Sequence, residues 1–286
     1  MTPPHATRDA IADILAFHVE AGVDVAMGEE PVDRFAESGS EARSPARMQR
    51  PAETPQPGPP SAAKGAPAAT RPPVGAAPPA PDIAAIGARE AAATAPDLDT
   101  LRSILDRFEG CPLKVTATQM VFADGNPKAR IMFVGEAPGR DEDIQGKPFV
   151  GRSGQLLDRM LAAIDLDRTS VYIANVVPWR PPGNRTPTPQ ETAICLPFIR
   201  RQIELADPDI LVCLGKPSAE TLLGIKDGIT KARGRWGEYD TGSRRIAAVP
   251  TFHPAFLLRS PLGKRMVWRD LLAIRNRLDA LPPRAR

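Results

Sequence analysis

The sequence predicts an α/β fold, a three-layer α/β/α sandwich with a central four-stranded parallel sheet. The first observation is a set of four short apolar runs of the kind that form buried parallel strands, at 130–134, 171–176, 210–214 and 246–252. The second is a set of helical patterns between and after these runs, at 153–164, 189–206, 218–223 and 264–278. The helix at 189–206 also begins with a capping box, Thr188-Pro189-Gln190-Glu191. Strands that alternate with helices in this way form a parallel sheet covered on both faces.

The first hundred residues differ in composition from the rest of the chain. Residues 7–24 place apolar side chains at helical spacing, which predicts a short helix. Twelve of the 33 prolines lie within 45–81, where so few large apolar side chains cannot offset the entropy cost of ordering. We therefore expect a helical segment at 1–30, a disordered Pro/Ala-rich linker at 31–98 and one folded domain at 99–286. The helix either docks on this domain or binds a protein partner.

Several classes of protein are disfavoured by the composition. The chain has no run of about 18 apolar residues, so we expect no membrane span. Its N-terminus lacks the basic and apolar segments of a secretory signal. Its three cysteines are an odd number and do not make a disulfide framework. We expect a monomeric, cytoplasmic protein.

The positive charge is concentrated in the last fifth of the chain. The net charge is +3, but residues 231–286 hold 13 basic and 4 acidic residues, while residues 101–230 hold 16 of each. A basic segment beside a neutral core suggests one positive face that binds a polyanion. A solvated surface without a partner is the alternative.

Three of the predicted strands run into polar side chains. The first runs into Gly135-Glu136, the second contains or ends at Asn175, and the fourth runs into His253. Because ligands bind at the carboxyl ends of parallel strands, these side chains should meet at one edge of the sheet. A carboxylate, an amide and an imidazole can together polarise water, read a polar ring and stabilise a developing anion. Each residue taken singly also has a purely structural explanation: a solvated acid, a backbone cap or a packed histidine.

The motifs around these strand ends resemble those of the family 4 uracil-DNA glycosylases. Four blocks occur in the family's order, and the resemblance covers roughly residues 105–280. They are Gly135-Glu136-Ala137-Pro138-Gly139 with 145–151, then 175–177, then Arg180-Pro181-Pro182-Gly183-Asn184-Arg185, and finally His253-Pro254-Ala255-Phe256-Leu257-Leu258-Arg259. The resemblance implies an enzyme that hydrolyses the N-glycosidic bond of flipped-out deoxyuridine in DNA, the first step of base excision repair. Residues 99–286 would be its catalytic domain.

The resemblance assigns roles to the residues of the site. Glu136 would assist the attacking water or stabilise the cationic sugar, and His253 would support negative charge on uracil O2. Gly135, Phe149 and Asn175 would bind uracil, with Phe149 stacking on the base and Asn175 pairing with its edge. For Phe149 the alternative is ordinary core packing.

The resemblance also implies how DNA is held. Leu257, Leu258 and Arg259 would wedge into the duplex where the base has left the stack, and we expect Arg185 and Lys264 to contact DNA as well. For Leu257 the alternative is again core packing. The substrate would be uracil-containing DNA, double- or single-stranded.

The chain departs from the family at its iron–sulfur cluster. The family holds a four-iron, four-sulfur cluster on four cysteines, and only Cys111 and Cys195 occupy such positions here. The other two positions are Phe108 and Trp179, and two thiolates are too few for the usual Cys₄ ligation. We therefore expect no cluster and no other metal. Cys213 lies inside a predicted strand, and we expect it to be a small core residue.

Three rival functions remain open at this point. One is a glycosylase of the same fold that prefers another deaminated base, such as hypoxanthine or xanthine. Another is a DNA-binding module without catalysis, against which Glu136 and His253 argue. The last is a small-molecule α/β hydrolase, for which the chain lacks a Gly-x-Ser-x-Gly nucleophile elbow.

Overall fold

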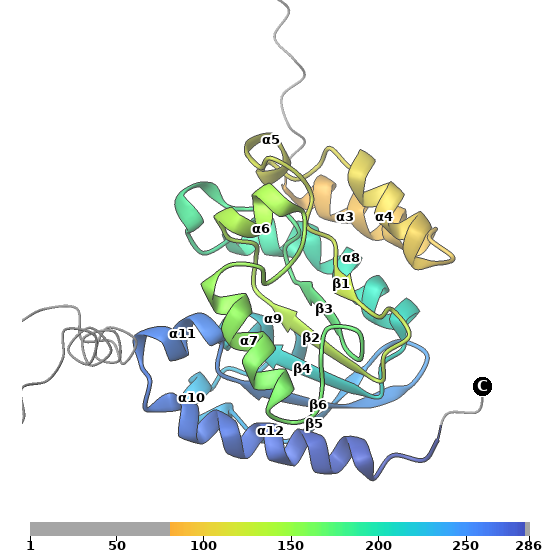
Figure 1. Cartoon of the computed structure of the whole chain (residues 1–286). Helices are drawn as coiled ribbons and strands as arrows, with labels where there is room; N and C mark the ends of the chain where they lie inside the picture. Colours follow the sequence, from red (N-terminus) through yellow and green to blue (C-terminus); the bar gives the residue numbers. More distant parts are fainter. Residues whose placement is uncertain (1–80, 284–286) are drawn as a thin grey trace, which may run out of the picture. The chain divides into compact units, whose positions relative to one another are not determined.

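The computed structural model describes residues 81–283, and these residues form one six-stranded sheet with helices on both faces (Figure 1). The strand order is β1-β3-β2-β4-β6-β5. The four predicted runs become the inner, parallel strands β2 (Ile131–Gly135), β3 (Tyr172–Asn175), β4 (Ile210–Leu214) and β6 (Arg245–Thr251). The helix predicted within 7–24 and the linker up to residue 80 lie outside the described residues.

The predicted number of strands is wrong, because the sheet has an added strand at each edge. β1 (Asp124–Gly125) pairs antiparallel with β3, and β5 (Gly237–Asp240) pairs antiparallel with β6. β1 has two residues and β5 exposes three of its four, so neither carries the apolar run that marks a buried strand.

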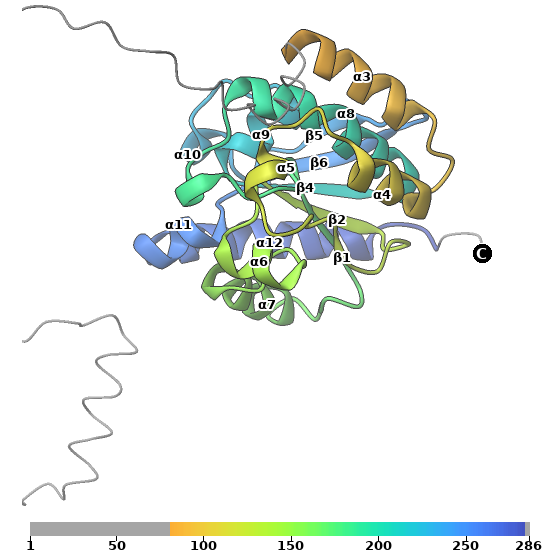
Figure 2. The ribbon, with the colours of Figure 1, turned by 90° about the horizontal axis from the view of Figure 1, so that it is seen from above.

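The two faces of the sheet bury separate apolar clusters, and this confirms the three-layer arrangement. Along β2, Ile131 and Phe133 join one cluster and Met132 and Val134 join the other, as expected for side chains that alternate along a strand. Figure 2 shows the sheet between the two groups of helices. The cluster that contains Ile131 and Phe133 lies under α7 (Arg152–Ala162), α11 (Pro254–Arg259) and α12 (Gly263–Asp279). The cluster that contains Met132 and Val134 lies under α4 (Leu98–Arg107), α8 (Pro189–Ala206) and α9 (Lys216–Leu223). The shorter helices are α5 (Leu113–Thr116), α6 (Arg140–Gln145), η1 (Pro182–Asn184) and α10 (Ile229–Ala232).

The capping box predicted for α8 is present. The Thr188 hydroxyl accepts a hydrogen bond from Glu191 N at 3.2 Å, and the Glu191 carboxylate accepts one from Thr188 N at 2.7 Å. The helix therefore begins where the sequence predicts.

A helix lies within the segment that we predicted to be a linker. Helix α3 (Pro81–Ala93) covers residues that we expected to belong to the linker at 31–98, and it packs against α8. Ala84, Ala88 and Ala92 are buried, and they stand four residues apart on one face of the helix. Small side chains let the two helices approach closely, but they leave a weak apolar signal in the sequence.

No helix within 81–283 is long and apolar enough to cross a membrane.

Candidate active site

The carboxyl ends of the parallel strands open into a cavity of about 200 Å³. Glu136 follows β2, Asn175 ends β3 and His253 follows β6, and all three line the cavity together with Phe149. The structure thus brings together the residues that the sequence analysis placed at one edge of the sheet. The cavity is also lined by Pro181, Asn184 and Ala255, which belong to the motif blocks but had no predicted role, and by Ser153 and Thr186, which the sequence did not indicate.

Gly135 makes room for the side chains of its neighbours. It pairs with Asn175 across β2 and β3. A Cβ atom on Gly135 would overlap Asn175 Oδ1 and would lie 2.6 Å from Phe149 Cζ. Any larger residue would therefore push the amide or the ring out of place. Gly135 contributes to the site by its lack of a side chain.

Asn175 presents an unused hydrogen-bond acceptor. The residue is 5% exposed, and its Oδ1 is buried without a hydrogen-bond partner within 81–283. A buried amide oxygen that lacks a partner costs about 1–3 kcal/mol. A ligand with an N–H group at this point would satisfy it.

His253 is held as a neutral hydrogen-bond donor. Its Nδ1 accepts a hydrogen bond from Ala255 N at 3.1 Å, so the ring proton of the neutral form belongs on Nε2. Burial, with a smaller contribution from the positive charge of Arg259, lowers the pKa of His253 to about 4. The imidazole is therefore uncharged at neutral pH and can donate through Nε2.

Glu136 lies in a site that disfavours its charge. Burial raises the pKa of its carboxyl above the ordinary value, and hydrogen bonding to the Thr186 hydroxyl partly opposes that shift. Its Oε1 is buried without a hydrogen-bond partner among the described residues. A carboxylate that is poorly solvated before substrate arrives interacts strongly with positive charge that develops beside it.

The predicted DNA-binding residues of α11 do not all reach the surface. Leu257 is 1% exposed and packs in the same apolar cluster as Leu161 and Val267. Leu258 is 39% exposed and Arg259 is also exposed. Leu257 therefore has to be corrected from a wedge residue to a core residue, because the packing of α11 against α7 places its side chain in this apolar cluster. Leu258 and Arg259 stay candidates for the wedge.

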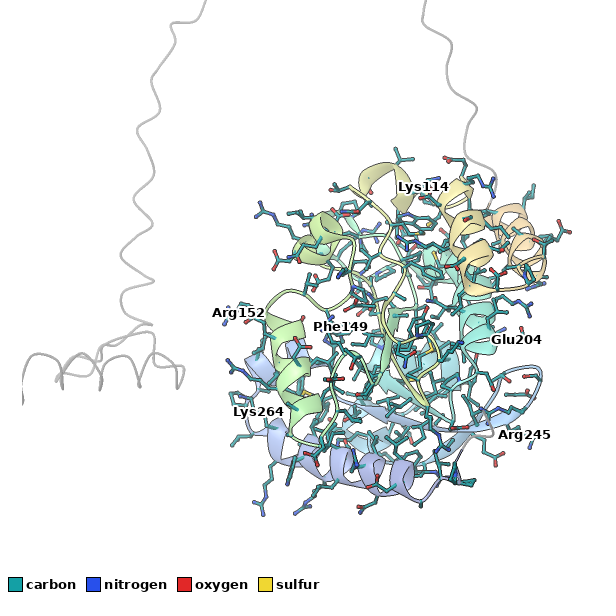
Figure 3. The ribbon with its side chains drawn as sticks, turned by 45° about the vertical axis from the view of Figure 1, so that its right-hand side comes forward. Lys114, Phe149, Arg152, Glu204, Arg245 and Lys264 are labelled. Carbon is teal, nitrogen blue, oxygen red and sulfur yellow. The ribbon has the colours of Figure 1, made fainter. Side chains whose placement is uncertain are left out.

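Arg185 and Lys264 are placed differently. Both Nη atoms of Arg185 donate to the carboxylate of Glu191, at 2.8 and 2.7 Å, and tie the loop before α8 to the start of that helix. Its side chain is still 43% exposed at the rim of the cavity. Lys264 is exposed at the start of α12, and Figure 3 shows it on the same side as Arg152.

The basic residues that the structure describes within 231–283 do not all lie on one face. Arg233 forms an ion pair with Asp270, and Arg244 forms one with Asp207 at 2.5 Å. Figure 3 shows Arg245 on the opposite side from Lys264. For these described residues the expected single face is wrong, because they lie on different sides of the domain and part of their charge is used in ion pairs.

The cysteine positions do not fit a four-cysteine cluster. Cys111 Sγ and Cys195 Sγ lie 3.8 Å apart and both residues are buried. Phe108 and Trp179 pack in the same apolar cluster, with Trp179 1% exposed. Within 81–283 there is no group of three or more His, Cys, Asp or Glu side chains placed to hold a metal. Cys213 is buried in β4, where burial raises the pKa of its thiol, as expected for a core residue.

The fold and the cavity define a class of protein: an α/β/α protein with a cavity that is lined by polar side chains at the carboxyl ends of its parallel strands. Residues 122–272 match the Uracil DNA glycosylase superfamily. The chain is 45% identical over 164 residues to the type-4 uracil-DNA glycosylase of Thermotoga maritima, covering 56% of this chain and 84% of that protein. It is 42% identical over 167 residues to the type-4 enzyme of Archaeoglobus fulgidus, covering 57% of this chain and 83% of that protein. The chain belongs to the type-4 branch of the uracil-DNA glycosylase superfamily.

Proposed function

We propose that this protein is a uracil-DNA glycosylase that hydrolyses the N-glycosidic bond of deoxyuridine in DNA, the first step of base excision repair. The observation that carries the proposal is the unpartnered Oδ1 of Asn175 in a cavity that it shares with Glu136 and His253. Uracil offers an N–H group to this acceptor, whereas the same ring position of cytosine carries no hydrogen. The family membership of the chain supports the same activity.

The chemistry follows from the protonation states of the site. The base leaves the stack at a cost of a few kcal/mol and enters the cavity, where Phe149 stacks on it. Asn175 Oδ1 accepts from uracil N3–H, and the amide nitrogen donates to O4. As the bond between C1′ and N1 breaks, its electron pair moves into the ring, and His253 Nε2–H donates to O2. The ionised Glu136 stabilises the cationic sugar and orients the water that adds to C1′, and the proton that this water loses neutralises the departed uracil anion.

A substitution at Asn175 tests the recognition step. Changing Asn175→Asp replaces the amide donor with an acceptor, which repels uracil O4 and suits the amino group of cytosine. We expect uracil excision to fall by about 10²-fold or more and weak excision of cytosine to appear. The measurement is single-turnover cleavage of U·G, U·A and C·G oligonucleotides by wild type and variant. Failure of the wild type to release uracil from either duplex would contradict the proposed function itself.

The pH dependence of excision is expected to follow Glu136. As the pH falls, Glu136 takes up a proton first, because its pKa is raised while the pKa of His253 is lowered to about 4. The rate should therefore drop through the raised pKa of Glu136, and no transition caused by His253 should appear near the ordinary histidine value of about 6.5. The measurement is the single-turnover rate as a function of pH for wild type and Glu136→Gln. The Gln variant should lack the acid limb, and a limb near the histidine value in both proteins would contradict this assignment.

We also propose that the protein works without the family's iron–sulfur cluster, with Phe108 and Trp179 occupying part of its space. Two thiols and two aromatic side chains do not provide Cys₄ ligation. Protein purified without oxygen should be colourless and should contain far less than about four iron atoms per chain. The measurement is a visible spectrum with iron analysis, and near-stoichiometric cluster iron would overturn the proposal.

The remaining proposals concern partners and location. We propose that the substrate is uracil in double- or single-stranded DNA, with Leu258, Arg259, Arg185 and Lys264 as contacts. We propose further that the protein is a cytoplasmic monomer and that the predicted helix within 7–24 binds the domain or a protein partner.

A further inference from the structure

Phe149 has a backbone conformation that its residue type disfavours. Its φ is +55°, in the left-handed region where residues other than glycine are uncommon. A bulky residue in this conformation is strained, and the conformation persists only when its surroundings enforce it. The conformation places the ring at the wall of the cavity, 5.3 Å from the ring of His253 between centroids.

Glu142 holds the backbone that follows Phe149. Its Oε1 accepts hydrogen bonds from Val150 N and Gly151 N, both at 3.0 Å, and its Oε2 accepts one from Gly139 N at 3.1 Å. The side chain is buried, so these charge-assisted bonds are shielded from water. One carboxylate thus joins the loop after β2 to the segment that carries Phe149.

Arg168 holds the same segment from the other side. Its guanidinium donates to Phe149 O and, at 3.1 Å, to Pro148 O. Its remaining donors pair with Asp124 and Asp158, both at 2.7 Å, so the guanidinium is itself fixed. Gly154 in α7 leaves the space for this geometry, because a Cβ there would overlap the Phe149 carbonyl group.

We propose that Glu142 and Arg168 are positioning residues that hold Phe149 in its left-handed conformation, so that its ring is in place before the base arrives. The inference rests on the proposed function, in which Phe149 stacks on uracil. Glu142 also lines the cavity, but both of its oxygens accept hydrogen bonds from backbone amides. In this proposal Glu142 and Arg168 therefore act on the base through the position of Phe149. The stacking surface is thereby preorganised by the fold, which spares the enzyme the cost of ordering it during each turnover.

A double-mutant cycle tests this coupling. Glu142→Gln keeps the shape of the side chain but turns one acceptor into a donor that faces a backbone N–H. We expect its single-turnover rate on a U·G duplex to fall by about 10- to 100-fold with DNA affinity within about threefold of wild type. In the Phe149→Ala background the same change should cost less than about threefold, because the ring that it positions is gone.

The controls separate a positioning role from a loss of stability. Asp209→Asn neutralises another ion-paired, largely buried carboxylate at the opposite ends of the strands, and it should leave the rate unchanged. Arg168→Lys keeps the charge but loses the fork, and it should give the same non-additive cycle if Glu142→Gln does not fold. Circular dichroism and the melting temperature check folding of each variant.

The outcomes are distinct. Non-additive losses with Phe149→Ala in either cycle support the positioning role. If the variants fold and stay active and their losses are fully additive, the positioning role is overturned while the proposed function stays intact. An inactive wild type contradicts the proposed function, and with it this inference.

Discussion

Replacing Glu136 or His253 with alanine is expected to lower the single-turnover rate of uracil excision by about 10²–10³-fold, with DNA affinity largely unchanged. Both groups act on charge that appears only as the glycosidic bond breaks. Glu136 faces positive charge on the sugar, and His253 donates through Nε2 to the departing base. Interactions made only in the transition state lower the rate and leave ground-state binding almost untouched.

The measurement uses a U·G oligonucleotide with enzyme in excess, together with a binding assay on the same duplex. His253→Gln is an informative companion, because a glutamine amide can still donate a hydrogen bond but cannot match the imidazole geometry held by Ala255 N. It should retain more activity than His253→Ala. Near-wild-type excision by both alanine variants would end the assignment of this cavity as the active site.

Replacing Trp179 with alanine is expected to lower the free energy of unfolding by about 3–5 kcal/mol. Trp179 is 1% exposed and shares an apolar cluster with Cys111, Cys195 and Phe108. Removing the indole leaves a cavity that the surrounding helices cannot fully close. The large effect is expected because, in our proposal, this side chain occupies space that a cluster fills in the family.

The measurement is urea unfolding followed by circular dichroism. Trp268→Ala is the matched control, because that indole is 43% exposed on α12 and its loss should cost less than about 1 kcal/mol. A cost below about 1 kcal/mol for Trp179→Ala would show that the region is loosely packed. The replacement of the cluster by side chains would then need another explanation.

The prediction of the inner sheet succeeded because its signals are local. Each inner strand is a short apolar run, and each is followed by a turn or a polar residue, as at Glu136 and His253. Because the inner strands are parallel and lie side by side, the residues that follow them meet at one cavity. The motif blocks identified the family for the same reason, since each is a contiguous stretch of chain.

The missed elements had signals too weak or too short to read. Helix α3 buries alanines, and alanine is common in both helices and linkers, so composition hid it. β1 has two residues, and its pairing with β3 depends on a contact far away in the chain. Thr186 follows the last residue of a recognised block, yet nothing local indicates that its hydroxyl would lie near Glu136.

By itself, the sequence determined the α/β class, the four parallel strands, the family and the chemical types that gather at the strand ends. Only the tertiary structure decided which of these side chains are buried, which have unused hydrogen-bonding atoms and which protonation state is favoured. The tertiary structure buries Leu257 in the core and leaves Asn175 Oδ1 without a hydrogen-bond partner among the described residues. It also places the ring proton of neutral His253 on Nε2. It also held Phe149 in a left-handed conformation through Glu142 and Arg168. Burial, tautomer and backbone strain depend on contacts between segments distant in the chain, and local sequence patterns do not encode those contacts.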